Sequence, residues 1–293
     1  MVNDPALKEF TFIPLEELSL LDRLMLLEEH LISPDFSAGG KGRAVVLSHD
    51  GQVSIMVNEE DHLRIQSLLS GLQLLETKRV VDEIDERLSV HLDFAFLENW
   101  GYLTACPTNV GTAMRASVMM HLPGLVMAKR MRGVVDFLSE RGTAVRGLFG
   151  EGTRALGNLY QISNQITLGE AEEEIITVLS EVCREVVKEE EKARKILLKD
   201  DEMGALDGVY RALGILSYAK KVSFEEAIDL LSTLRLGVET GLLPSFDGID
   251  LNELMFLVRP AHLQNFIKRS LPEEEQDIAR ASLIKERLSL QGS

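Results

Sequence analysis

The chain is poor in cysteine and in positive charge. Its 293 residues include only two cysteines, Cys106 and Cys183, so no disulfide framework is implied and a reducing cytosol fits. Thirty-one lysines and arginines stand against 47 acidic residues, which gives a formal net charge of −16. This balance argues against a protein that binds nucleic acid or an anionic membrane. Basic protein substrates would instead be attracted to such a surface.

Targeting signals and long apolar segments are also missing from the sequence. The first ten residues, MVNDPALKEF, have neither the basic nor the apolar region of a signal peptide. The most apolar run, 118–128, is interrupted by His121 and Pro123 and is too short to span a bilayer. With 45% hydrophobic and 27% charged residues, the composition is that of a soluble globular protein. We therefore expect a cytoplasmic protein.

The spacing of apolar residues predicts an α+β fold: a mostly antiparallel sheet flanked by helices, followed by a helical subdomain at 200–293. Strands at 43–48 and 52–58 flank His49-Asp50-Gly51, which is typical of a hairpin turn. Further strands are predicted at 63–69, 101–105, 143–149 and 159–168. Helices are predicted at 15–31, 72–98, 117–120, 123–140, 170–199, 202–219, 223–236, 250–258 and 272–290.

Three short segments each combine a reactive or acidic side chain with an arginine. They are NEEDHLR (58–64), CPTNVGTAMRAS (106–117) and RGLFGEG (146–152). In the second segment, the proline, asparagine, glycine and threonines favour irregular backbone with free N–H groups. Each segment alone has an ordinary explanation: a buried small thiol, a solvated acidic turn or a surface arginine. Their presence in one chain makes a joint function the better interpretation.

Together with NLYQISNQITLG (158–169), these segments resemble the ATP:guanido phosphotransferases, the family of arginine and creatine kinases. The resemblance runs from about residue 15 to the C-terminus. Within the family, the stretches 28–34, 115–123 and 251–260 are similar to the bacterial branch that phosphorylates arginine side chains in proteins. The resemblance therefore implies an ATP-dependent kinase that marks proteins for regulated degradation or controls a stress response.

Transfer of phosphate to a guanidinium is demanding because the nucleophile is a cation with a pKa above about 12. Two carboxylates can clamp this planar group, orient one nitrogen and accept a proton. The resemblance implies that Glu60 and Glu151 do this, and the neighbouring Glu59 could substitute. If 58–61 is extended, side-chain alternation would bring only one of Glu59 and Glu60 into the site. Cys106 is implied as a thiolate beside the guanidinium, acting through positioning and electrostatics.

The ATP side of such a reaction needs cations aimed at phosphate oxygens, because the phosphoryl group in transfer is electron-rich. Arg64, Arg115 and Arg146 are suited to this role, since a guanidinium binds phosphate in bidentate fashion. The resemblance adds to the nucleotide site His30, Ala116, Ser117, Val118, Met119 and Glu151. We expect Mg²⁺ to be carried by the phosphates and water, with few or no protein ligands.

The resemblance also implies partners and a regulatory segment. The partners are proteins with exposed arginine, an activator protein, the Clp protease machinery and a second copy in a homodimer. Relatives carry an Arg-Asp-x-x-Arg-Ala pattern in a pocket for phosphoarginine, whereas this chain has Gln276 at the first position of 276–281. A glutamine cannot supply the charged fork that phosphate prefers. We therefore expect weak or absent activation by phosphoarginine.

Two alternatives to a protein kinase stay open. One is a kinase that stores phosphate on a small guanidine metabolite such as free arginine or creatine. The other is a relative that binds arginine or phosphoarginine with little turnover. The latter has weight because family members carry a Ser-x-Arg-x-Arg-type segment upstream, whereas the first arginine here is Arg23. We expect a catalytic domain at 1–199 that is truncated at its N-terminus and binds ATP weakly, unless the natural protein begins further upstream.

Overall fold

The structure is a computed structural model that describes residues 9–147, 155–246 and 248–289. The chain divides into two compact units. The first unit comprises Met1–Ser117 and Ser163–Ser180, and the second comprises Val118–Ile162 and Glu181–Ser293. Antiparallel sheet and flanking helices in the first unit, and many helices in the second, confirm the predicted α+β class.

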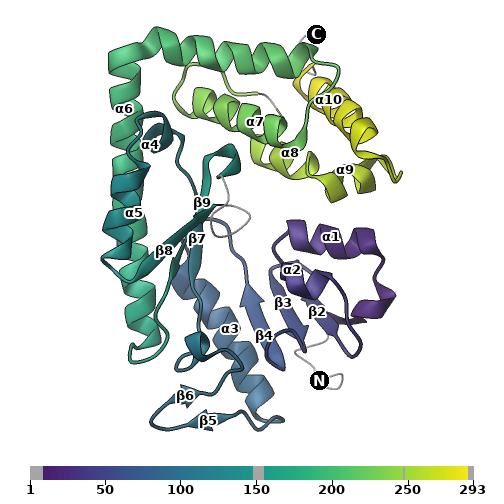
Figure 1. The fold of residues 1–293 in the computed structure, drawn as a ribbon, viewed down its shortest axis with the longest axis vertical. Helices are drawn as coiled ribbons and strands as arrows, with labels where there is room; N and C mark the ends of the chain where they lie inside the picture. Colours follow the sequence, from purple (N-terminus) through teal and green to yellow (C-terminus); the bar gives the residue numbers. More distant parts are fainter. Residues whose placement is uncertain (1–8, 148–154, 247, 290–293) are drawn as a thin grey trace. The chain divides into compact units, whose positions relative to one another are not determined.

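A four-stranded antiparallel sheet in the order β1-β2-β3-β4 forms the centre of the first unit. The paired residues Val45 and Met56 face one side of this sheet, and the paired Val46 and Ile55 face the other. Helices α1 and α2 cover the first side and α3 covers the second (Figure 1). The bounds are β1 Phe10–Pro14, α1 Leu20–Glu28, α2 Pro34–Ser37, β2 Ala44–Ser48, β3 Val53–Val57, β4 Leu63–Ser67 and α3 Leu74–Ser89.

Three local features of this unit differ from what the sequence predicts. The edge strand β1 was not predicted, although it pairs with all of β2. The predicted helix at 15–31 is instead a short 3₁₀ turn at Leu15–Glu17 followed by α1. The helix predicted to reach residue 98 ends at Ser89, and beyond it Phe94 packs edge-on against Tyr102. The residues beyond it form a two-stranded antiparallel ribbon of β5 Phe96–Leu97 and β6 Gly101–Tyr102 (Figure 1).

The second unit contains most of a three-stranded sheet in the order β7-β9-β8. Its strands are β7 Ser117–His121, β8 Thr143–Gly147 and β9 Leu159–Asn164. The helix predicted at 117–120 is therefore wrong. Exposed Ser117 and Met119 alternate with less exposed neighbours, which is the two-residue period of a strand. A short apolar run alone cannot distinguish a strand from a buried helix, so pairing with β9 decided the outcome.

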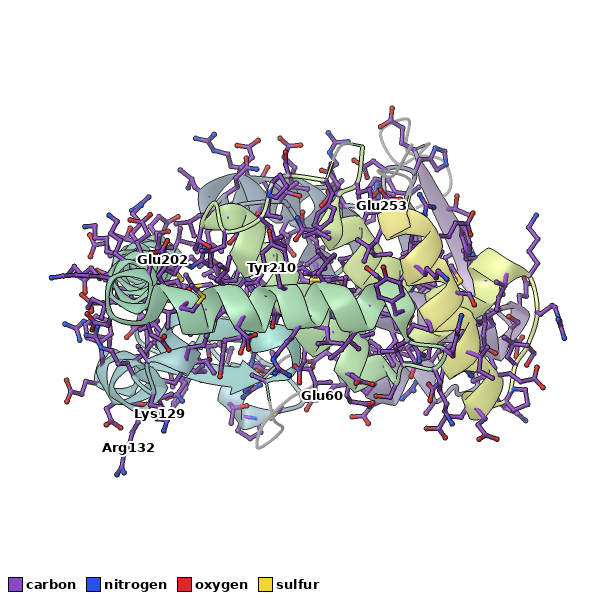
Figure 2. The ribbon with its side chains drawn as sticks, turned by 90° about the horizontal axis from the view of Figure 1, so that it is seen from above. Glu60, Lys129, Arg132, Glu202, Tyr210 and Glu253 are labelled. Carbon is purple, nitrogen blue, oxygen red and sulfur yellow. The ribbon has the colours of Figure 1, made fainter. Side chains whose placement is uncertain are left out.

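Helices make up most of the rest of the second unit, and the helix Glu172–Tyr218 begins in the first unit, which extends to Ser180. Their bounds are α4 Pro123–Met127, α5 Met131–Ser139, α6 Glu172–Tyr218, α7 Phe224–Glu239, α8 Leu251–Leu257, α9 Pro260–Ile267 and α10 Glu273–Ser289. The predicted helix at 123–140 is two helices, because Lys129 adopts a left-handed φ of 56° between them. The side chains of Lys129 and Arg132 project at this junction (Figure 2). Helix α9 was not predicted.

Helix α6 joins the two helices predicted at 170–199 and 202–219. Its backbone is non-helical at Asp201, where φ is −151°, and the helix axis turns there (Figure 1). The Asp201 carboxylate accepts a hydrogen bond of 2.9 Å from the Gly204 N–H, as a residue that begins a helix does. Exposed Tyr210 lies on the second half of α6 (Figure 2). That half packs with α7, α8 and α10 around a buried core that includes Val209, Leu231, Leu254 and Ile284.

None of the helices in the described part of the chain is long and apolar enough to cross a membrane.

Candidate active site

The acidic motif forms the loop at 58–62 between β3 and β4. Asn58 adopts a left-handed φ of 59°, and its N–H donates to the His62 carbonyl at 2.9 Å. These residues are a bend and not an extended strand, so the alternation considered for Glu59 and Glu60 has no basis here. The two carboxylates nevertheless have different surroundings.

Glu59 is held by the protein, whereas Glu60 is exposed. The Glu59 side chain is 10% exposed and accepts hydrogen bonds from Ser33 Oγ at 2.6 Å, the Glu60 N–H at 2.8 Å and Arg64 Nη1 at 3.4 Å. Burial raises the pKa of Glu59, but these hydrogen bonds and the arginine charges outweigh it and hold the pKa below 4.5. Among the described residues, the exposed Glu60 carboxylate has no hydrogen-bond partner. Glu60 is thus the carboxylate available to a ligand.

Asp61 connects the acidic loop to the cysteine motif. Its Oδ1 accepts a hydrogen bond of 2.6 Å from the N–H of Ala105, the residue before Cys106. The two segments are 44 positions apart in the sequence. This contact brings together two motifs that the sequence analysis had paired only by resemblance.

The cysteine motif begins with a 3₁₀ turn, Pro107–Asn109, that follows the half-buried Cys106. The Cys106 Sγ lies 3.0 Å from Thr108 Oγ1, and the Cys106 carbonyl accepts from the Asn109 N–H at 3.0 Å. Further on, the exposed Arg115 donates from Nε to Asn109 Oδ1 at 3.2 Å. The turn therefore fixes the thiol and one guanidinium on the same loop.

Two buried polar residues that the sequence analysis did not single out hold this loop. Asn164 accepts from the Ala116 N–H at 2.8 Å and donates to the Met114 carbonyl at 3.1 Å. The Thr167 hydroxyl lies 3.0 Å from the Thr108 carbonyl and 2.8 Å from the Val110 carbonyl. Both residues lie within 158–169, the one resembling segment to which no role was given. Polar side chains in that otherwise strand-like run were the available signal, because buried polar groups need partners.

Gly111 lets three backbone segments approach each other. Its φ is 110°, and a side chain there would collide with the Thr167 carbonyl. The Gly111 N–H donates to the Tyr102 carbonyl at 3.2 Å, and the Tyr102 N–H donates to the Gly111 carbonyl at 2.8 Å. The cysteine loop is thereby fixed between the β5–β6 ribbon and the 164–168 segment, so glycine is required for a steric reason.

His30 has a structural position as well as a predicted role near the nucleotide. It follows α1 with a left-handed φ of 61°. Its N–H donates to the Leu27 carbonyl, the Leu31 N–H donates to the Leu26 carbonyl, and the two bonds end the helix as a Schellman motif. The His30 carbonyl accepts from Gln66 Nε2 of β4 at 2.7 Å. The backbone of His30 is therefore fixed, while its contact with a nucleotide stays a prediction.

Of the remaining predicted site residues, Ser117 begins β7 in the first unit, and the others belong to the second unit. Val118 and Met119 lie in β7, and the half-buried Arg146 lies in β8. Glu151 falls in 148–154, outside the described residues. Within 9–147, 155–246 and 248–289, no group of three or more histidine, cysteine, aspartate or glutamate side chains could hold a metal ion.

Comparison with known families places the chain in a class of enzymes. The profile "ATP:guanido phosphotransferase, C-terminal catalytic domain" matches residues 3–193. The chain therefore belongs to the ATP:guanido phosphotransferase family, and it is a kinase by that membership. A second profile, "Protein-arginine kinase McsB C-terminal domain", matches residues 203–293.

Its similar relatives are named for one member of that class. The protein-arginine kinase of Halothermothrix orenii is 47% identical over 279 residues, covering 95% of this chain and 80% of that protein. The protein-arginine kinase of Pelotomaculum thermopropionicum is 53% identical over 271 residues, covering 92% of this chain and 76% of that protein.

Solved structures of guanidino kinases share the fold. The duplicated taurocyamine kinase from Schistosoma mansoni matches with a TM-score of 0.56 and 29% identity over 62% of this chain. A crystal structure of lombricine kinase matches with a TM-score of 0.51 and 26% identity, also over 62%. The chain spans 27% of the first protein and 54% of the second.

Proposed function

We propose that this protein uses ATP to phosphorylate arginine side chains of other proteins. Family membership supports the kinase chemistry, and the relatives named protein-arginine kinase support the substrate. The observation that carries the proposal is the 2.6 Å bond between Asp61 and the Ala105 N–H. It holds an exposed carboxylate, Glu60, and a thiol, Cys106, on neighbouring loops, which supports a shared role of the two groups toward one guanidinium.

On the substrate side, Glu60 and Glu151 are proposed to clamp the guanidinium and to accept its proton during transfer. Glu60 suits this role because its carboxylate is exposed, whereas Glu59 is occupied by Ser33, Arg64 and a backbone N–H. Cys106 is proposed to position the guanidinium and to stabilise its charge. Covalent catalysis by the thiol is not part of this mechanism.

On the ATP side, Arg64, Arg115 and Arg146 are proposed to bind phosphate oxygens. Residues of the first unit fit such a ligand, because the Arg64 side chain is 50% exposed and the exposed Arg115 leaves donors beyond its bond to Asn109. His30 and the segment 116–119 complete the proposed nucleotide site. Bound Mg²⁺ would neutralise charge on the phosphates, which would themselves carry the ion with water.

The domain organisation and biological role belong to the same proposal. A catalytic domain at 1–199 and a helical subdomain at 200–293 are supported by the family matches at 3–193 and 203–293. A cytoplasmic location, a stress-response role, an activator protein, the Clp protease machinery and a homodimer are proposed from the family resemblance.

One assay separates this function from its two alternatives. The 293-residue chain is incubated with ATP and Mg²⁺, and with either unfolded casein or free arginine; acid-labile phosphate is then measured. A protein kinase labels casein with far higher kcat/KM than free arginine. Preferential labelling of free arginine would identify a small-guanidine kinase. Binding of either substrate without any labelling would identify a relative that recognises arginine without turnover.

A further inference from the structure

The β5–β6 ribbon exposes large apolar side chains immediately before the cysteine motif. Phe96, Leu97 and Trp100 are 55%, 51% and 55% exposed, and Leu103, after the ribbon, is 44% exposed. All residues from 95 to 100 are exposed. Several large exposed apolar side chains on one short ribbon mark an interaction site more often than a packing defect.

The ribbon is anchored by other residues, so its fold does not explain this exposure. The Tyr102 hydroxyl donates to Asp85 Oδ2 of α3 at 3.0 Å, and Phe94 packs against the core of the unit. Backbone hydrogen bonds between Tyr102 and Gly111 fix the ribbon to the cysteine loop. Leu97 and Trp100 contribute to none of these contacts.

The charge around the ribbon selects the kind of partner. From residue 82 to 103 the chain has six acidic residues and one arginine; of the six, Asp82 pairs with Lys78 and Asp85 accepts from Tyr102. Asp93 and Glu98, within or beside the ribbon, are both exposed. Exposed apolar surface bordered by carboxylates is complementary to a polypeptide that presents apolar side chains next to arginine. A free guanidine metabolite has no apolar side chain to place there.

We infer that the β5–β6 ribbon is a docking surface for unfolded, arginine-bearing segments of protein substrates. This inference rests on the proposed function, and it names the feature of the substrate that is recognised outside the site of transfer. Apolar residues flanking the target arginine pack on Leu97 and Trp100, and the arginine reaches the loops that carry Glu60 and Cys106.

The test compares two peptides that lack tryptophan, each with a central arginine, flanked either by leucines or by serines. In the unaltered protein, the leucine peptide has the lower KM. Replacing Leu97→Ser and Trp100→Ser together raises the KM for the leucine peptide about tenfold, since roughly half of two apolar side chains is no longer buried. The KM for the serine peptide and the kcat for both peptides stay unchanged. The matched control is Met203→Ser with Tyr210→Ser, which removes exposed apolar groups from α6 and leaves both KM values unchanged.

Trp100 provides a readout that does not depend on catalysis, because it is the only tryptophan of the chain. Binding of the leucine peptide shifts its emission to shorter wavelength, while the serine peptide and free arginine do not. If neither peptide is phosphorylated but the emission shifts, the proposed function fails and the docking surface stands. An unchanged KM in the double variant, or no emission shift, overturns the docking surface. It is also overturned if sedimentation shows the double variant dissociating from dimer to monomer, since a second copy would then cover the ribbon.

Discussion

Judged from the sequence, two arginine-bearing segments of this chain could each bind phosphate. In the structure, their arginines have different surroundings. Arg115 in the cysteine motif is exposed, and its Nε donates to Asn109. Arg280 in the 276–281 segment is 2% exposed. It donates to the Val258 and Val222 carbonyls, each at 2.9 Å, and to Asp277 Oδ1 at 2.6 Å. The first arginine is available to a ligand, and the second holds the helical core together.

The same contrast separates Glu59 from Glu60 within one loop. In both cases a charged group engaged by several protein atoms is held by the fold, and its exposed counterpart is available to a ligand. Sequence motifs cannot make this distinction, because it depends on which carbonyls and hydroxyls the fold brings alongside. The predictions below test it, from the largest expected effect to the smallest.

The first prediction concerns the two carboxylates. Glu60→Gln is expected to lower the rate of phosphotransfer by about 10²–10⁴-fold, because a positioned proton acceptor is lost. Its melting temperature should stay within a degree or two of that of the unaltered protein, since the Glu60 side chain is exposed. The measurement is kcat with casein and ATP, paired with a thermal melt.

Two variants serve as controls for this prediction. Glu59→Gln should lower stability more than Glu60→Gln does, because Ser33 and Arg64 would lose a charged partner. Cys106→Ala should affect the rate less than Glu60→Gln. If Glu60→Gln keeps nearly normal activity, the assignment of the exposed carboxylate to catalysis is wrong.

The second prediction concerns the two arginines. Arg280→Met is expected to lower the free energy of unfolding by about 3–5 kcal/mol, as removal of one partner from a buried ion pair does. Arg115→Met should change it by less than about 0.5 kcal/mol, because the side chain is exposed. Urea unfolding followed by circular dichroism measures both. Equal losses in the two variants would contradict the division between a structural and a ligand-binding arginine.

The sequence was sufficient for the features that rest on long patterns. The α+β class and the two helices on either side of residue 200 followed from apolar spacing, and the β2–β3 hairpin followed from an Asp-Gly turn. The helix ends were harder, since α1, α4 and α9 are followed by left-handed residues that are not glycine: His30, Lys129 and Lys268. At such positions the sequence does not indicate that the helix ends, because tertiary packing and not residue type imposes the left-handed conformation.

The motifs of the candidate site could be recognised in the sequence, whereas the contacts that support them could not. The acidic and cysteine motifs could be recognised from their letters, but the bond from Asp61 to Ala105 and the hydrogen bonds of Asn164 and Thr167 could not. These contacts join residues between about 40 and 60 positions apart. No local pattern encodes pairs at that separation, which are fixed only when the strands have paired.

The third prediction extends the comparison to a buried histidine of the second unit. The His121 side chain is 3% exposed; its Nε2 lies 2.7 Å from Ser232 Oγ, and its Nδ1 lies 4.0 Å from Glu239. Burial, with the charge of Arg235, lowers its pKa from 6.5 to about 3. The unfolded chain therefore binds a proton between these values and the folded protein does not, so stability falls as pH decreases below 6.5.

At pH 5 the free energy of unfolding should be lower by about 2 kcal/mol because of this site. Urea unfolding at pH 7 and pH 5 measures it. In His121→Asn the contribution from this site should vanish, whereas the exposed control His62→Asn should keep the full difference. A difference that is the same in His121→Asn and in the unaltered protein would show that other groups cause it.

The smallest expected effect is the response to phosphoarginine, and it tests the opening comparison directly. If the 276–281 segment serves the fold, free phosphoarginine should change the kinase rate less than about twofold. Arg280 is occupied by two carbonyls and Asp277, and Gln276 donates to the Leu271 carbonyl at 2.8 Å instead of presenting a charge. The measurement is the initial rate with casein while phosphoarginine is titrated. A Gln276→Arg variant restores one guanidinium without disturbing Arg280, so activation confined to that variant would locate the deficiency at Gln276. Strong activation of the unaltered protein would mean that Arg280 can leave its carbonyl partners for a ligand, and that burial in this segment does not mark a purely structural charge.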